Sequence, residues 1–216
     1  MELLQRNMTA SPAVGTQLIN GMVFDRELLP TGTKKLQMFA QYAGTGRSSV
    51  IGAQATDRKD AGDTNLPEAG KVSADKPIRC TGFYLLWEAG GSATTFDLPE
   101  GFGIEAAKDV EAMIASCSIS LVINGSELLT GPAIAFPAPV GRQVQIAADR
   151  ATGGGVLANI QYVGQVYEFL NGFNWTNKDD VRVNLIFNNQ SGVTIPSGFT
   201  GRVTAVMTGT FVKALN

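Results

Sequence analysis

The sequence contains no histidine, and this absence excludes a large share of enzyme chemistry. Histidine is the commonest general base near neutral pH, the usual partner of a nucleophilic serine or cysteine, and the commonest zinc ligand. No other combination of residues in the chain identifies a reaction. We therefore expect a protein that is not an enzyme, with no catalytic residues, no cofactor and no bound metal.

Charged residues are also scarce, at 17% of the chain, and the two signs nearly cancel. With 17 basic and 19 acidic side chains, the formal net charge is -2 at pH 7. A protein that binds nucleic acid needs a surplus of basic side chains to neutralise phosphates. The composition therefore predicts no sequence-specific nucleic-acid partner.

Cysteine is rare, with Cys80 and Cys117 far apart in the chain and each inside an apolar run. They form no C-x-x-C pair of the kind used for redox chemistry or metal binding. We expect both to be small buried hydrophobic side chains rather than a disulfide or a reactive thiol.

Long apolar runs are missing as well. No segment reaches the roughly 18 uncharged apolar residues that span a bilayer. The first residues, MELLQRNMTASPAVG, lack the basic and continuous apolar regions of a signal peptide. We therefore expect the chain to fold in a cytoplasm.

What the sequence does contain is apolar residues with a period of two, which is typical of half-buried strands. In DVRVNLIF, for example, Val181, Val183 and Leu185 alternate with Arg182 and Asn184. Eight segments of this kind predict strands, at 34–42, 78–88, 117–124, 127–136, 142–149, 156–168, 181–188 and 202–213. The dipeptide Asn124-Gly125 predicts a tight hairpin turn between the third and the fourth.

One segment has a helical period instead. Between 103 and 115, apolar residues recur at spacings of three and four, as in an amphipathic helix. Because strands and helices do not alternate along the chain, an α/β fold is disfavoured. The pattern predicts a mainly β protein: an antiparallel β-sandwich, specifically an eight-stranded single jelly roll with one inserted helix and long loops.

Two segments contain few core-forming residues. Residues 1–33 are interrupted by proline and glycine and predict an extended N-terminal arm, which leaves 34–216 for the jelly-roll domain. Residues 43–77 predict a long surface excursion from that domain. Contacts with other subunits would supply the burial that these segments lack. The expected interface residues are Leu18, Ile19, Met22, Phe24, Val50, Ile51, Phe173 and Trp175.

The excursion includes a short acidic stretch, DRKDAGDTN, at residues 57–65. Its aspartates could gather around a hard cation, but their spacing is not that of an EF-hand. Arg58 and Lys59 also dilute the negative charge. We interpret the stretch as a polar loop.

Aromatic residues are concentrated in two places, around 83–87 and between 162 and 175. Placement with a period of two inside strands favours a role in the core, and a sugar-binding surface is the alternative. Phe169, Phe173 and Trp175 are expected in a loop bordered by Gly172, where exposed aromatics would anchor a protein interface.

Several of these features together resemble the jelly-roll coat proteins of tailless icosahedral viruses, especially bacteriophages with an internal membrane. They are the interrupted N-terminal segment, the polar excursions, the hairpin ISLVINGSELL, and a last strand, GRVTAVMTGTFVKALN, at the end of the sequence. The resemblance implies a jelly roll that stands in a shell and contacts neighbouring subunits through its arm and loops. Coat proteins of that lineage often carry two jelly rolls, whereas this length suits one.

The function expected from the resemblance is that of a capsid subunit that self-assembles into an icosahedral shell, in a virion assembled in the host cytoplasm. Its partners would be further copies, in trimers or pentamers, and other virion proteins; contact with an internal membrane stays open. The alternative is a carbohydrate-binding, lectin-like jelly roll, such as a receptor-binding or minor vertex or cement protein of a phage.

Overall fold

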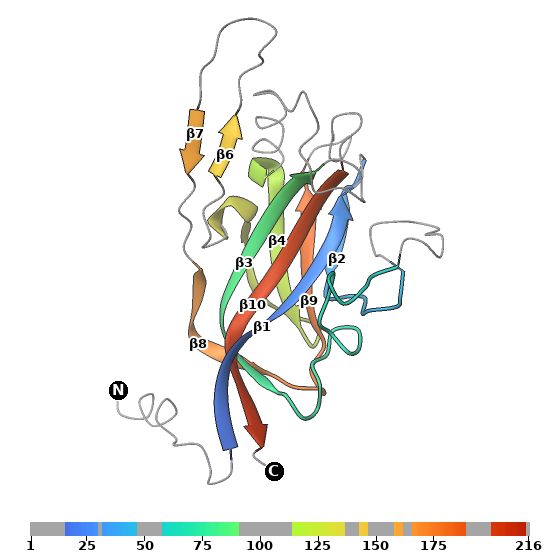
Figure 1. Ribbon diagram of the computed structural model, residues 1–216, viewed down its shortest axis with the longest axis vertical. Coiled ribbons are helices and arrows are strands. Elements are labelled where there is room, and N and C mark those ends of the chain that lie inside the picture. The colour runs from blue at the N-terminus through green and yellow to red at the C-terminus, as the bar shows by residue number, and fades with distance from the viewer. Residues whose placement is uncertain are drawn as a thin grey trace, which may run out of the picture.

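The computed structural model describes residues 16–29, 32–46, 58–90, 114–136, 143–146, 158–161, 166–188 and 200–214. These residues are mainly β (Figure 1). The strands are β1 (Thr16–Leu29), β2 (Lys35–Met38), β3 (Ile78–Gly90), β4 (Cys117–Ile123), β5 (Ser126–Pro132), β6 (Gln143–Ile146), β7 (Ala158–Gln161), β8 (Tyr167–Trp175), β9 (Val181–Phe187) and β10 (Thr200–Ala214). A short 3-10 helix, η2 (Ala133–Ala135), follows β5.

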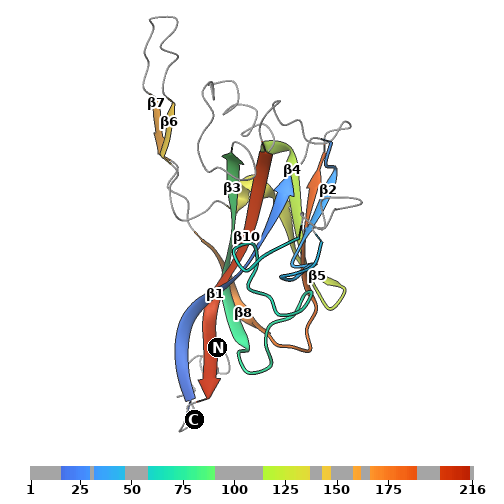
Figure 2. The same ribbon diagram turned by 45° about the vertical axis from the view of Figure 1, so that its right-hand side comes forward.

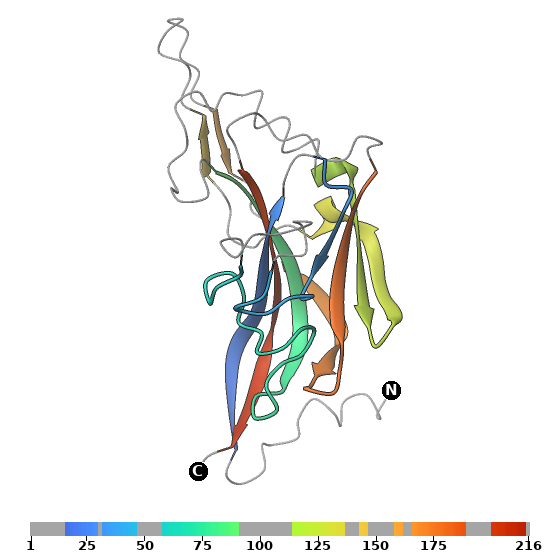
Figure 3. The ribbon, with the colours of Figure 1, turned by 90° about the vertical axis from the view of Figure 1, so that its right-hand side faces the viewer.

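Eight of the strands form two antiparallel sheets of four strands each. One sheet has the order β1-β10-β3-β8 and the other β2-β9-β4-β5. Figure 3 shows the two sheets face to face, with β1, β10 and β3 on one side and β9, β4 and β5 on the other. Strands β6 and β7 pair with each other as a separate hairpin, drawn above the two sheets in Figure 1.

The hydrophobic core lies between the two sheets, and strand periodicity explains its composition. In β9, Val181, Val183, Leu185 and Phe187 are all buried, as the alternation of the sequence predicts. The ring of Phe187 meets that of Trp87 on β3 edge to face, with centroids 6.3 Å apart, so the contact crosses from one sheet to the other. Burial of each such side chain contributes about 1.5–3 kcal/mol.

Two other local predictions are confirmed. Asn124 and Gly125 join β4 to β5 with φ angles of 51° and 80°, the positive values that a two-residue hairpin turn requires. Cys80 and Cys117 are free and buried, and burial raises the pKa of each thiol to about 12.

The predicted N-terminal arm is wrong for residues 16–29, because these residues form β1, which pairs with β10 along its whole length. Glycine and proline do not interrupt this strand: Gly21 lies opposite Gly209, and Pro30 comes after the end of β1. The predicted arm residues 1–15 lie outside the described part of the chain.

The other predicted strands are found, with some different bounds: the segment 127–136 is a strand only as far as Pro132, because Ala133–Ala135 form η2, and of the segment 142–149 only Gln143–Ile146 is described. The segment 34–42 is a strand only as far as Met38, because Phe39 has a positive φ of 60°. The segment 156–168 contains the short β7 and the start of a separate strand, β8. Most of the predicted helix 103–115 lies outside the described residues; residues 114–116 are helical.

One close approach of backbones gives a test of the pairing between β10 and β3. A Cβ atom on Gly209 would lie 2.1 Å from the carbonyl oxygen of Arg79, so neither strand has room for a side chain there. We expect Gly209→Ala to lower the free energy of unfolding by about 3 kcal/mol, since it overpacks backbone against backbone. Urea denaturation measures this loss.

Gly44 is the matched control. It has a φ of 89° and open space around its Cα, so Gly44→Ala adds backbone strain without a clash. Its expected cost is about 1 kcal/mol. Equal losses for the two variants would contradict the close approach at Gly209.

Candidate functional site

An apolar strip lies on the outer face of the sheet, at the end where β1 begins and β10 ends. We define the strip as Leu18, Met22 and Val212, which are 51%, 50% and 40% exposed. Leu18 lies opposite Val212 in the ladder, and Met22 is four residues further along the same face of β1. Pairing of β1 with β10 continues past Ile78, the first residue of β3, so this end extends below the rest of the sheets in Figure 2.

Four of the predicted interface residues are therefore on β1. Leu18, Ile19 and Met22 are exposed, as the prediction required, while Phe24 is half-buried. Ile19 lies on the opposite face of the strand from the strip, directly across from Phe211. Val50 and Ile51 lie outside the described residues.

The prediction that Phe173 and Trp175 are loop aromatics is wrong, because both belong to β8. Trp175 is completely buried, and its indole Nε1–H donates a hydrogen bond of 3.0 Å to the carbonyl oxygen of Gly70. Phe173 packs against the core together with Phe169 and Tyr167. The interpretation of these aromatics as core residues is confirmed. Because Trp175 is buried, it is not available to a sugar-binding surface.

The predicted surface excursion is also corrected in part, because residues 58–66 pack along the edge of β1. The backbone N–H of Arg26 donates to the carbonyl oxygen of Asp63 at 2.7 Å. The Asn65 side chain accepts from the N–H of Phe24 and donates to the carbonyl oxygen of Met22. The segment therefore covers the edge of the sheet beside residues 22–26, and Leu66 enters the core.

A buried cluster of charges joins this segment to β1. Asp25 and Glu27 are two residues apart, so both project from the inner face of the strand, with Val23 and Leu29. The Lys59 Nζ lies 2.6 Å from Asp25 Oδ1 and 2.5 Å from Glu27 Oε1, and all three side chains are inaccessible to solvent. We call these three residues the buried cluster.

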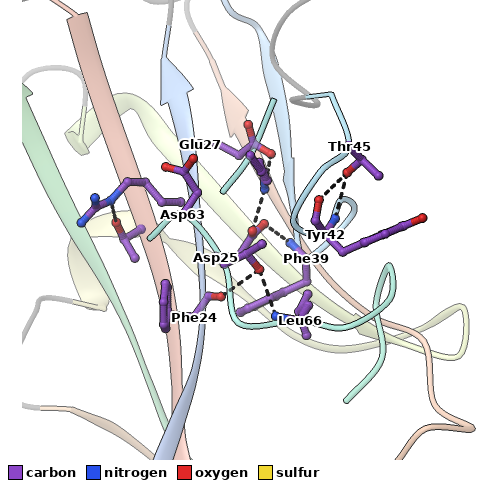
Figure 4. A network of polar contacts seen from close by, with 12 residues as sticks. Phe24, Asp25, Glu27, Phe39, Tyr42, Thr45, Asp63 and Leu66 are labelled. Carbon is purple, nitrogen blue, oxygen red and sulfur yellow. Dashed lines mark hydrogen bonds and ion pairs between the residues drawn. The ribbon is translucent and has the colours of Figure 1, made fainter. Parts of the chain in front are cut away.

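The second carboxylate oxygen of Asp25 is held by the turn after β2. The backbone N–H of Phe39 donates to Asp25 Oδ2 at 2.6 Å, shown as a dashed line in Figure 4. This turn is itself fixed, because the Phe39 carbonyl accepts from the N–H of Gly70 at 2.7 Å. The Phe39 ring also meets the ring of Trp175 edge to face.

Both backbone groups of Lys59 are also bonded. Its N–H donates to the carbonyl oxygen of Thr45 at 2.9 Å, and its carbonyl oxygen accepts from the N–H of Gly44 at 2.8 Å. The backbone of Lys59 is therefore fixed by one loop while its ammonium group contacts β1.

Burial raises the pKa of Asp25 from 3.8 to about 6, and the nearby Glu27 adds to the rise, while Lys59 and the hydrogen bond from Phe39 oppose it. Desolvation outweighs the attraction to Lys59 because the carboxyl group is shielded from water, and the repulsion from Glu27 adds a smaller contribution in the same direction. Asp25 therefore exchanges between its protonated and ionised forms close to neutral pH. The arrangement places an amine against two carboxyl groups in a site without solvent.

Sequence reasoning missed the buried cluster. Lys59 was interpreted as a residue that dilutes the charge of a polar loop, and β1 was interpreted as an arm. One signal was available: Val23, Asp25, Glu27 and Leu29 follow a period of two, which places two acids on an otherwise apolar face.

Two further searches concern the described residues alone. Among them, no group of three or more histidine, cysteine, aspartate or glutamate side chains is arranged to hold a metal ion. None of the helices in that part of the chain is long and apolar enough to cross a membrane.

No protein-family model matches the sequence, and no curated protein matches it.

The buried cluster predicts a large stability loss when its cation is removed. Lys59→Met leaves Asp25 and Glu27 buried without the ammonium group between them. We expect the free energy of unfolding to fall by about 3–5 kcal/mol, as for other buried ion pairs broken on one side. Lys71→Met is the matched control, because Lys71 forms a salt bridge with the exposed Glu68 and should cost at most about 1 kcal/mol.

The loss in Lys59→Met should also depend on pH. An acid whose pKa is raised by folding stabilises the folded state fully below its ordinary pKa, and this contribution is lost as the pH rises through the raised value. In the wild type folding raises the pKa of Asp25 to about 6, and loss of Lys59, which lowers this pKa, raises it further in the variant. Below about pH 6 Asp25 is protonated in both folded proteins, so the deficit is constant there. As the pH rises above about 6, Asp25 ionises first in the wild type, so the deficit grows with pH and shrinks on acidification. Urea denaturation at several pH values checks this, and a deficit that grows on acidification contradicts it.

Proposed function

We propose that this protein is a single-jelly-roll capsid subunit that assembles with further copies into a closed shell. The observation that carries the proposal is the nesting of the strand pairs. With the β6–β7 hairpin set aside, the first strand pairs with the last, β1 with β10, and the second with the next to last, β2 with β9. Inside these lie the pairs β3 with β8 and β4 with β5.

Nested pairs of this kind are what a long antiparallel hairpin produces when it is rolled up into two facing sheets. That arrangement is the jelly roll, a fold of viral coat proteins and of lectins. Fold alone does not choose between these two functions. The choice between a coat protein and a lectin rests on which apolar and aromatic side chains are exposed.

The apolar strip favours assembly over carbohydrate binding. Leu18 and Val212 are exposed opposite each other at one end of the sheet, and Met22 is exposed on the same face beyond the polar pair Asn20 and Thr210. Exposed apolar side chains gathered at one end of a sheet are typical of protein interfaces. The aromatic side chain best suited to a sugar site, Trp175, is buried. A second copy that packs on the strip would remove this apolar surface from water, and closed symmetry would repeat the contact around a trimer or a pentamer.

Light scattering coupled to size-exclusion chromatography tests the proposal, with negative-stain images of any large fraction. Trimers, pentamers or closed particles are expected. A compact monomer at every concentration contradicts the proposal and favours the lectin-like alternative, for which a glycan screen is the next measurement.

Substitutions in the strip should abolish assembly without unfolding the subunit. In Leu18→Asp and Met22→Asp, a charge replaces an apolar group that the proposal buries between copies, so the large fraction should shift to monomer. Leu170→Asp is the control, because Leu170 is 95% exposed on β8, at the opposite edge of the same sheet. Circular dichroism checks that the folds are equal. Assembly that survives both strip substitutions contradicts this interface.

A further inference from the structure

The buried cluster has the components of an amide-forming site, not only those of an ion pair. Lys59 Nζ lies 2.6 Å from Asp25 Oδ1, so the amine nitrogen is next to the carboxyl carbon that it would attack. On its other side Nζ lies 2.5 Å from Glu27 Oε1, a group able to take its proton. All three side chains are inaccessible to solvent, so water does not compete with the amine.

We propose that Lys59 and Asp25 form an intramolecular amide bond between Nζ and Cγ, with Glu27 as the catalytic proton carrier. This modification does not depend on the capsid function. It requires no oxidant, cofactor or metal, because the amine, the carboxyl group and the base all belong to the folded chain.

The reaction is a condensation that releases one water molecule. Glu27 takes a proton from the Lys59 ammonium group, and the free amine attacks Cγ of protonated Asp25. The C–N bond forms, the bond from Cγ to Oδ1 breaks, and Oδ1 leaves as water. The three ammonium protons and the one carboxyl proton end as two on water, one on the amide nitrogen and one on Glu27.

The backbone N–H of Phe39 supplies the hydrogen-bond donor that stabilises the oxyanion of the reaction. Attack on Cγ places negative charge on Asp25 Oδ2, and the N–H of Phe39 already donates to that atom at 2.6 Å. A fixed backbone donor aimed at a developing oxyanion is the usual way in which acyl transfer is stabilised. The turn that carries this donor is held by the hydrogen bond from Gly70, so it need not move during the reaction.

The protonated form of Asp25 that the reaction needs is accessible in the folded protein. Burial raises the pKa of Asp25 to about 6, so a substantial share of this carboxyl group is protonated at mildly acidic pH. Holding the three groups in contact replaces an encounter in solution, which removes the entropic part of the barrier to amide formation.

Intact mass spectrometry under denaturing conditions tests the proposal. The full-length protein should be lighter than its sequence mass by one water molecule. After trypsin digestion, residues 7–26 and 59–71 should appear as one joined peptide, because cleavage falls after Arg6, Arg26, Arg58 and Lys71. Peptide 7–26 found alone at unmodified mass, together with peptide 60–71 from cleavage after a free Lys59, would overturn the proposal.

Three substitutions separate the roles within the cluster. Asp25→Asn should form the same amide with loss of ammonia instead of water, so its product has the same mass as the wild-type product. Lys59→Arg should remain unlinked. Glu27→Gln should keep the neighbouring groups but slow the reaction at least about hundredfold, since it lacks the base.

Lys71→Arg is the control for lysine substitution in general and should cross-link fully. Circular dichroism establishes which variants are folded, and the folded wild-type protein is incubated below, at and above the pKa of Asp25. An unmodified mass in this folded protein at every pH overturns the proposal even if a variant fails to fold. A loss of water that maps to any pair other than residues 25 and 59 overturns it as well.

Discussion

Two acids on the inner face of a strand are the constraint on which the first half of this molecule depends. Asp25 and Glu27 lie where core side chains are required, and an ionised carboxylate in that position is costly unless it is paired and hydrogen-bonded. Lys59 and the backbone of Phe39 satisfy this need. To reach Asp25 and Glu27, residues 58–66 must lie along β1, and there they also cover an edge of the sheet that would otherwise be open to pairing.

Sequence reasoning predicted those parts of the fold in which local pattern and tertiary packing agree. In β9 the alternation of valine and leucine with polar residues gave both the strand and its buried face. The turn at Asn124-Gly125 was also predictable, because few other dipeptides accept two positive φ angles. Both features depend on neighbouring residues alone.

The features that were missed depend on contacts between distant residues. β1 contains glycine and two buried acids, so it is a poor strand by composition, and its pairing with β10 determines its conformation. Lys59 is buried because it contacts Asp25, which lies 34 residues away in the sequence, so its own neighbours do not reveal its burial. The burial of the Trp175 indole similarly depends on its hydrogen bond to the carbonyl oxygen of Gly70, 105 residues away in the sequence. Leu18, Ile19 and Met22 are exposed on β1, and their role in an interface stays a prediction, whereas the arm that was expected to carry them is a strand from Thr16 to Leu29.

The position of β10 also sets the order in which the molecule can be completed. β10 lies between β1 and β3, yet it is the last of the described strands in sequence order. β1 and β3 are therefore synthesised before the strand that pairs with both of them, and each exposes backbone N–H and C=O groups until β10 joins them. Chains dominated by such distant pairings fold slowly. Truncation within β10 would accordingly separate β1 from β3 instead of removing a peripheral element.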